Sequence, residues 1–177
     1  MHYEAKLVYF FPIAISAEEK IKIGLLVPLT GENKELGQQI IKSTRIALKD
    51  INTEKIEIYL KDTNSNPNKT AKSAIELKEM GIKIVIGPVF YNSLMYLSEI
   101  KEITFLSLTN KTLDLPSNVI STGVNATSQL AAIKKFLNSN EIKKTIMLTP
   151  ELDYKDEIKK GIKQSKIKIS KHYVYDT

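Results

Sequence analysis

Polar side chains that could bind a ligand gather in three short stretches of this 177-residue sequence: Leu29–Gly37 (LTGENKELG), Pro88–Ser93 (PVFYNS) and Thr109–Leu113 (TNKTL). Together they supply hydroxyls, amides and two aromatic rings, but no convergent pair of carboxylates and no histidine. Hydroxyl and amide groups suit the holding of a small polar molecule, whereas acid–base catalysis needs titratable groups placed together. We therefore expect a binding site and no catalytic residues.

The first stretch lacks the pattern of a phosphate-binding loop. Lys34 is followed by Glu35 instead of Ser or Thr, and Gly31 and Gly37 lie six residues apart. This spacing fits neither a P-loop nor a dinucleotide fingerprint. We therefore expect no cofactor, and a nucleotide-using enzyme would need the loop that this sequence lacks.

Several polar residues also have purely structural interpretations. Phe90 and Tyr91 can pack against the edge of a sheet, and Asn92 or Ser93 can cap a helix that follows. Asp62, at the end of another predicted strand, is interpreted as a turn residue. For the aromatic and capping residues, both the structural interpretation and the ligand-binding interpretation stay open.

Histidine and cysteine are almost absent. The sequence has no cysteine and only two histidines, His2 and His172, which lie near its two ends. This excludes disulfides, a thiol nucleophile and cysteine-ligated zinc, and it leaves little for His-based triads. We expect no metal site.

The basic excess is concentrated near the C-terminal end. The formal net charge is +6, and residues 134–177 hold 11 basic and 6 acidic residues. Arg45 is the only arginine, although base-reading and phosphate-clamping surfaces depend on arginine. Lys155, Lys159 and Lys163 lie four residues apart, which is typical of a solvated helix stripe. We therefore expect no nucleic-acid partner.

Residues 1–17 have the pattern of a secretory signal peptide. A short start with Lys6 precedes the apolar run Leu7–Ile15, and Ile15-Ser16-Ala17 supplies a small-residue cleavage site. A strand or buried arm is the alternative. We expect export to the periplasm. No apolar run approaches the roughly 20 residues needed to span a bilayer, so we expect no transmembrane helix.

Hydrophobic periodicity predicts an α/β chain in which strands alternate with helices. The predicted strands are 21–28, 55–61, 82–87, 103–108, 119–122, 145–149 and 167–175, and the predicted helices are about 36–51, 67–80, 92–101, 127–137 and 152–164. Such alternation builds a mostly parallel sheet, and ligands bind at the carboxyl ends of its strands. The three polar stretches follow predicted strands, so we expect them at this edge.

The expected architecture is two lobes of unequal completeness. Residues 20–122 are predicted to form a Rossmann-like lobe with a parallel sheet, and residues 123–177 an incomplete second α/β lobe. Two lobes of ordinary size need roughly 250–300 residues. We therefore expect a truncated chain that exposes one apolar edge.

The order of several segments resembles a known family. The segments are IKIGLLVPLTG at 21–31 followed by Leu36-Gly37, the helix end ALKDIN at 47–52, and IVIGP at 84–88. This order is similar to the type I periplasmic-binding fold, and more narrowly to the leucine/isoleucine/valine-binding domain, from about Lys20 to Thr177. The resemblance implies two Rossmann-like lobes that clamp a solute, and a binding protein instead of an enzyme.

The resemblance also assigns ligand-binding positions. It implies that the loops at 91–93 and 109–112 hold the carboxylate and ammonium groups of an amino-acid-like ligand, and that Tyr154 closes over it. The expected ligand-binding residues are Thr30, Tyr91, Asn92, Ser93, Thr109, Asn110, Thr112 and Tyr154. The sequence departs from amino-acid binders at Leu36, Tyr91-Asn92 and Lys155.

One branch of this family, the penicillin-binding protein activators, is a better match. The resemblance lies in GPVF at 87–90, in the short connection 102–107 and in LTP at 148–150. It implies an envelope protein whose partner is a peptidoglycan synthase. The alternative is the amino-acid-binding protein of an ABC importer, whose partner is a permease. We expect this chain alone to bind free amino acids weakly or not at all.

Overall fold

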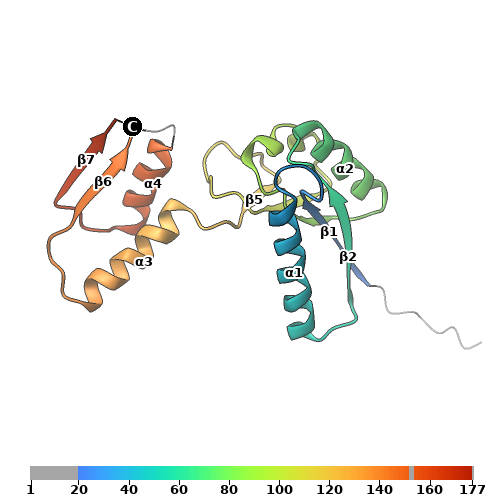
Figure 1. Cartoon of the computed structure of the whole chain (residues 1–177), viewed down its shortest axis with the longest axis horizontal. Helices are drawn as coiled ribbons and strands as arrows, with labels where there is room; N and C mark the ends of the chain where they lie inside the picture. Colours follow the sequence, from blue (N-terminus) through green and yellow to red (C-terminus); the bar gives the residue numbers. More distant parts are fainter. Residues whose placement is uncertain (1–19, 152–153, 177) are drawn as a thin grey trace, which may run out of the picture.

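Two parallel sheets organise the computed structural model, which describes residues 20–151 and 154–176 (Figure 1). The first has the strand order β2-β1-β3-β4-β5 and the second pairs β6 with β7. The strands are β1 (Ile21–Val27), β2 (Ile56–Asp62), β3 (Ile84–Ile86), β4 (Thr104–Ser107), β5 (Val119–Ser121), β6 (Ile146–Pro150) and β7 (Lys171–Tyr175). Every strand pair in the described residues is parallel, which confirms the predicted α/β fold class.

The helices follow the predicted pattern with one exception. They are α1 (Lys34–Ile51), α2 (Pro67–Glu79), α3 (Ala126–Ser139) and α4 (Lys155–Ser165). Where a single helix was predicted over 92–101, the structure has two short 3-10 helices, η1 (Tyr91–Leu94) and η2 (Leu97–Glu99). The amide of Asn118 donates to the carbonyls of Leu97 and Ile100, which ties η2 to the segment that precedes β5.

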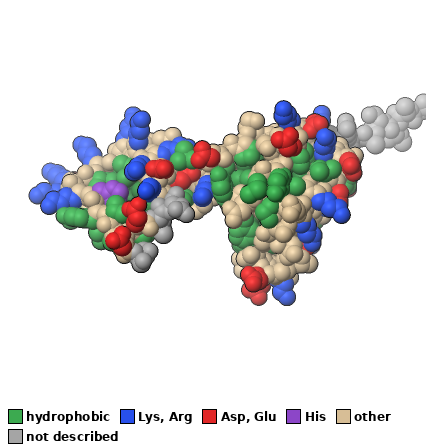
Figure 2. All heavy atoms as spheres, turned by 90° about the horizontal axis from the view of Figure 1, so that it is seen from above, with side chains coloured by type: hydrophobic (Ala, Val, Ile, Leu, Met, Phe, Trp, Pro, Cys, Tyr) green, Lys and Arg blue, Asp and Glu red, His purple; other side chains and the backbone are tan. Residues whose placement is uncertain are grey.

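Local sequence explains where α2 and α3 begin. The Asn66 side chain accepts a hydrogen bond from the Lys69 N–H, and Pro67 takes the first helical position. At α3, Asn125 and Ser128 form a capping box, which satisfies two backbone donors reciprocally. This second cap sets the start of α3. We call β1–β5 with α1, α2 and the 3-10 helices the first lobe, and α3, β6, α4 and β7 the second lobe (Figure 2).

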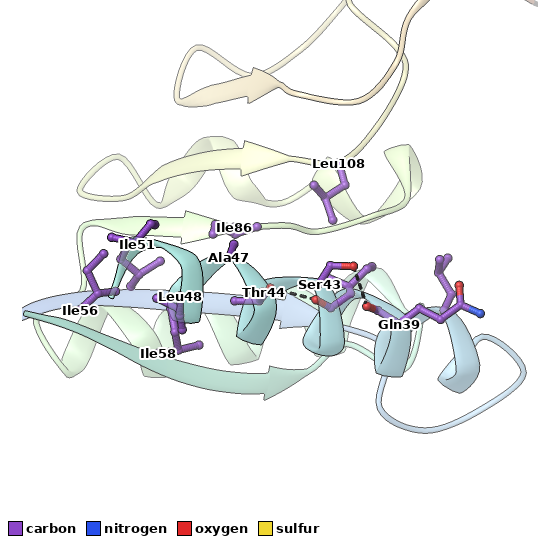
Figure 3. A pocket seen from close by; sticks show the side chains of 13 residues that line it. Gln39, Ser43, Thr44, Ala47, Leu48, Ile51, Ile56, Ile58, Ile86 and Leu108 are labelled. Carbon is purple, nitrogen blue, oxygen red and sulfur yellow. Dashed lines mark hydrogen bonds between the residues drawn. The ribbon is translucent and has the colours of Figure 1, made fainter. Parts of the chain in front are cut away.

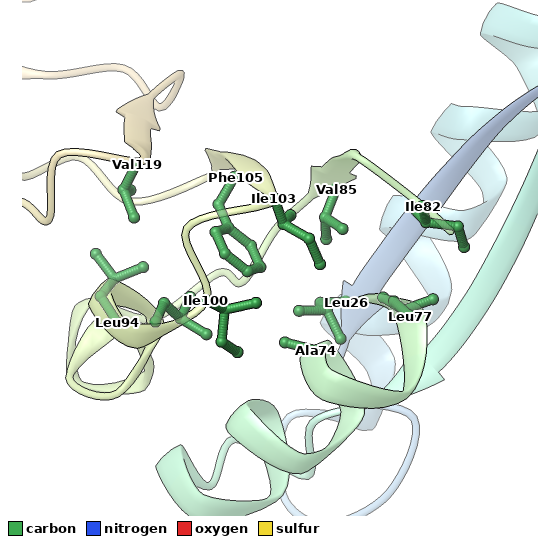
Figure 4. Close-up of a cluster of buried hydrophobic side chains, with 11 residues drawn as sticks. Leu26, Ala74, Leu77, Ile82, Val85, Leu94, Ile100, Ile103, Phe105 and Val119 are labelled. Carbon is green, nitrogen blue, oxygen red and sulfur yellow. The ribbon is translucent and has the colours of Figure 1, made fainter. Parts of the chain in front are cut away.

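The main core lies on one face of the five-stranded sheet, under α2 and the 3-10 helices (Figure 4). Leu26, Leu77, Val85 and Phe105 are fully buried there. Gly24 lets α2 approach closely, because a Cβ at this position would lie 2.7 Å from a Leu77 methyl carbon. Burial of each large side chain stabilises the fold by about 1.5–3 kcal/mol, so this face anchors the first lobe.

The opposite face of this sheet is only partly covered, by α1. Gly37 is the only buried residue of that helix, and a hollow of about 560 Å³ lies between it and the sheet (Figure 3). Ile84 and Ile120, on the same face of the sheet, are 41% and 53% exposed. The first lobe therefore presents an apolar sheet face beside α1.

The second lobe also has one covered and one open sheet face. Helix α4 packs over the face that carries Thr149 and His172, whose side chains hydrogen-bond at 2.8 Å. The other face exposes Ile146, Leu148 and Tyr173, which are 61%, 67% and 49% exposed. Between residues 20–151 and 154–176, no helix has the length and hydrophobicity needed to cross a membrane. The predicted signal peptide, residues 1–17, lies outside the described residues.

Candidate functional site

Two of the predicted loops lie side by side at the carboxyl ends of β3 and β4. The Tyr91 ring packs against the core, and its hydroxyl donates to the Asp114 carbonyl at 3.4 Å. The Lys111 ammonium lies 4.3 Å from the centre of the same ring, a cation–π contact. Tyr91 therefore fastens the loop after β4 to the start of η1, which supports the packing interpretation of this residue.

Thr109 is buried in the loop after β4, and its hydrogen bonds hold the loop in shape. It is 4% exposed, its hydroxyl accepts from the Lys111 N–H, and its carbonyl accepts from the Ser121 hydroxyl at 2.7 Å. Gly123 must be glycine, because a Cβ there would lie 2.4 Å from the Thr109 carbonyl oxygen. These contacts leave the backbone N–H groups of Thr112 and Leu113 as the donors that the loop presents to the second lobe.

A carboxylate of the second lobe accepts hydrogen bonds from those donors. Glu157, in the first turn of α4, accepts from Thr112 N at 2.5 Å and Leu113 N at 2.7 Å through Oε1. Its Oε2 accepts from the Thr112 hydroxyl at 2.6 Å. One turn further along α4, Lys160 Nζ donates to the Thr112 carbonyl and hydroxyl oxygens, both at 2.9 Å. We call these four residues the Glu157 clasp.

The Glu157 carboxylate is held in its charged form. Glu157 is 5% exposed, and burial alone would raise the pKa of its carboxyl. The hydrogen bonds from the Thr112 hydroxyl and the two backbone N–H groups, with the Lys160 charge, outweigh burial and lower the pKa below its ordinary value. A buried anion with this many donors is an integral part of the joint between the lobes.

Tyr154 adds a second contact between the lobes. Its hydroxyl donates to the Asn110 carbonyl at 3.3 Å. Burial, followed by the nearby Glu157 charge, raises the pKa of the Tyr154 hydroxyl. Tyr154, Glu157 and Lys160 are spaced three apart, so they lie along one side of the helix start and meet the same loop.

Thr30 belongs to a different cluster, at β2. Its hydroxyl donates to Asp62 Oδ2 at 2.7 Å, and the same carboxylate accepts from Leu29 N, Asn64 N and Lys69 Nζ. Burial would raise the pKa of Asp62, but the bonds from Lys69, Thr30 and the backbone hold it well below its ordinary value. Asp62 thus closes a turn, as predicted, and also ties the loop after β1 to β2.

The structure places the eight predicted residues in several different settings. Asn110, Thr112 and Tyr154 meet at the joint between the lobes. Tyr91 is bonded to Asp114, and Thr30 is bonded to Asp62. Ser93 and Thr109 are buried, at 1% and 4% exposed. Asn92 is exposed and lines a hollow of about 470 Å³ with Asp114 and Leu115.

Sequence reasoning missed Glu157 and Lys160, the two side chains that reach furthest into the loop after β4. Their one visible feature is the spacing from Tyr154 on an amphipathic helix. In residues 20–151 and 154–176, no group of three or more acidic or His side chains is arranged to hold a metal ion. The site can form hydrogen bonds and ion pairs, and its polar groups already do so with each other.

A family comparison decides what kind of protein carries this site. Residues 20–167 match the family model described as periplasmic binding protein. The chain belongs to the periplasmic binding protein family. The chain is 33% identical to the Leu/Ile/Val-binding protein BraC3 of Rhizobium johnstonii over 91 positions. This alignment covers 48% of this chain and 25% of BraC3.

Solved structures of envelope binding proteins and regulators share the fold of this chain. The C-domain of LpoA from Haemophilus influenzae, described as a regulator of PBP1A, superposes with a TM-score of 0.69 at 19% identity, over 87% of this chain and 50% of that one. The leucine-binding protein LivK of Thermotoga maritima gives a TM-score of 0.56 at 20% identity, over 89% and 49%. The chain thus spans about half of each of these periplasmic binding domains, and the relatives are binding proteins and regulators.

Proposed function

We propose that this chain is an exported, non-enzymatic binding domain that acts by contacting a protein partner in the cell envelope, a peptidoglycan synthase. The resemblance to the penicillin-binding protein activators and the fold likeness to the LpoA C-domain, described as a regulator of PBP1A, support this choice. Membership of the periplasmic binding protein family supports the envelope location, and the pattern of residues 1–17 supports export through a signal peptide.

The Glu157 clasp is the observation that carries the proposal. A solute receptor needs free donors between its lobes to bind a carboxylate ligand. Here Thr112 N and Leu113 N are hydrogen-bonded to the buried Glu157 carboxylate, and Lys160 is bonded to the same loop. The donors that a carboxylate ligand would use are thus bonded within the chain, which suits a domain that presents a preformed surface to a partner.

The two carboxyls that accept the most hydrogen bonds are suited to structural roles and not to acid–base catalysis. General acid–base chemistry at neutral pH needs a group whose pKa lies near 7. The two carboxyls with the most donors, Asp62 and Glu157, both have a lowered pKa and make structural hydrogen bonds. Neither is free to exchange a proton at neutral pH, so both serve to hold loops in place.

The alternative is a substrate-binding protein of an amino-acid ABC importer, with a permease as partner. The identity with BraC3, a Leu/Ile/Val-binding protein, favours it. So does the exposed amide of Asn92 beside the hollow that Asp114 lines. In this alternative the amino-acid ligand would bind near Tyr91 and Asn110 and would leave the clasp in place or displace Glu157.

Thermal unfolding separates the two functions. A ligand at a hundredfold excess over its Kd stabilises a protein by about 2.7 kcal/mol, which raises Tm by several degrees. We expect no shift with leucine, isoleucine, valine or the other common amino acids. A shift of several degrees with any of them would overturn the proposal and support the importer.

A binding assay tests the partner directly. The full chain, immobilised, should retain the extracytoplasmic part of a peptidoglycan synthase from the same cell. Glu157→Ala, which loosens the joint between the lobes, should weaken that binding, whereas Glu141→Ala, an exposed glutamate of the second lobe, should not. Absence of binding with wild type would contradict the proposed partner.

A further inference from the structure

A lysine-rich hollow occupies the end of the second lobe that lies away from the Glu157 clasp. It measures about 590 Å³ and lies between the end of α3, the connection from α3 to β6, and the connection from α4 to β7. Its four charged lining residues are all lysines: Lys134, Lys143, Lys166 and Lys168.

The charges of the second lobe are segregated along its strands. Because β6 and β7 are parallel, both connections that carry the lysines lie at their amino ends. The carboxylates of Glu151, Asp156, Glu157 and Asp176 lie at or beyond the carboxyl ends. A five-residue strand is about 16 Å long, twice the Debye length of about 8 Å at physiological salt. These carboxylates therefore do little to neutralise the lysines.

Little at the basic end offsets its charge. Within the described residues, Glu141 is the carboxylate that lies on the same connection as Lys143. Lys134 donates to the Ser165 carbonyl at 3.2 Å, where it complements the C-terminus of α4. No hydrogen bond or ion pair between described residues involves the side chain of Lys143, Lys166 or Lys168. These three ammonium groups face solvent.

The floor of the hollow is apolar. Leu137, Ile142 and Ile167 line it beneath the lysines, and Ile142 is 44% exposed. Lysine stems can lie along such a floor while their charged ends reach outward. Lysine is a flexible point charge, so this arrangement suits a diffuse negative surface better than one ligand of fixed shape or a nucleic acid read by arginine forks.

We propose that this lysine-rich hollow docks the second lobe on an anionic phospholipid surface. Each lysine near an anionic bilayer contributes favourable binding free energy. Removal of three such lysines should therefore weaken binding to the bilayer by about a hundredfold. The contact adds a membrane surface to the partners of the protein. It does not depend on the peptidoglycan synthase proposed above, because it uses the opposite end of the lobe from the clasp.

Vesicle co-sedimentation of the full chain tests the proposal. Wild type should bind vesicles of phosphatidylcholine with phosphatidylglycerol, and should not bind phosphatidylcholine alone. Raising the salt from about 0.1 M to about 1 M, which shortens the Debye length from about 10 Å to about 3 Å, should release it. The triple variant K143Q/K166Q/K168Q should bind about a hundredfold more weakly.

A matched variant makes the result specific. K42Q/K49Q/K83Q removes the same charge from exposed lysines of the first lobe and should bind like wild type. Both variants keep residues 1–19, so any binding by that segment cancels in the comparison. Equal loss of binding in the two variants, absence of binding to the anionic vesicles, or binding to soluble polyanions such as heparin but not to vesicles would overturn the proposal. Equal melting curves of both variants confirm that each is folded.

Discussion

Replacement of Glu157 by alanine should open the joint between the lobes. The change removes a 5% exposed carboxylate that accepts three hydrogen bonds, and leaves Thr112 N and Leu113 N without their acceptor. Removal of one partner from a buried charged cluster typically costs about 3–5 kcal/mol. The lower value corresponds to a factor of about a hundred in the equilibrium between the joined and the open arrangement.

Amide hydrogen exchange measures this opening residue by residue. The N–H groups of Thr112 and Leu113 should exchange about a hundredfold faster in Glu157→Ala than in wild type. The Phe105 N–H, which donates to the Asn118 carbonyl inside the first sheet, should keep its wild-type rate. Glu157→Gln, which keeps the size of the side chain and loses its charge, should give a smaller acceleration.

Two outcomes would refute this reasoning. Unchanged exchange at Thr112 and Leu113 in Glu157→Ala would mean that the clasp does not hold the lobes together. Equal acceleration at Phe105 would mean that Glu157 supports the fold of the first lobe and not the joint. Glu141→Ala, at an exposed position of the same lobe, serves as the control and should leave all three rates unchanged.

Three further predictions concern stability. The pKa values of Asp62 and Glu157 lie below their ordinary values of 3.8 and 4.5, so their stabilisation should be complete above about pH 5. It should be lost as the pH falls through 4.5 toward the folded-state pKa values, which Tm measured against pH will show as an acid-side decline. Gly123→Ala should lower stability by about 1–3 kcal/mol, because its Cβ would meet the Thr109 carbonyl, and an unchanged Tm would contradict this close approach. Asn118→Ala should lower Tm by about 4–8 °C, since it removes three part-buried side-chain hydrogen bonds to backbone carbonyls and costs about 2 kcal/mol; urea titration gives an independent value.

Local sequence patterns were sufficient to predict the helices and strands and part of the candidate site. Alternating and continuous apolar runs predicted the strands, and the Asn66-Pro67 pair predicted the start of α2 within a residue. The interpretation of Asp62 as a turn residue is confirmed by its bond from Asn64 N. These features depend on residues close together in the chain, where composition and spacing carry the information.

The sequence by itself determined the α/β alternation, the cap of α2 at Asn66 and the loops that follow the carboxyl ends of the strands. Tertiary structure alone decided what those loops bind. Glu157 lies 45 residues after Thr112, and only the packing of α4 against the loop after β4 brings them within 2.6 Å. The same holds for Asn118, whose amide binds the carbonyls of Leu97 and Ile100 from outside the 92–101 segment. Long-range hydrogen bonds of this kind have no periodicity in the sequence, because each depends on where two separately folded segments meet in space.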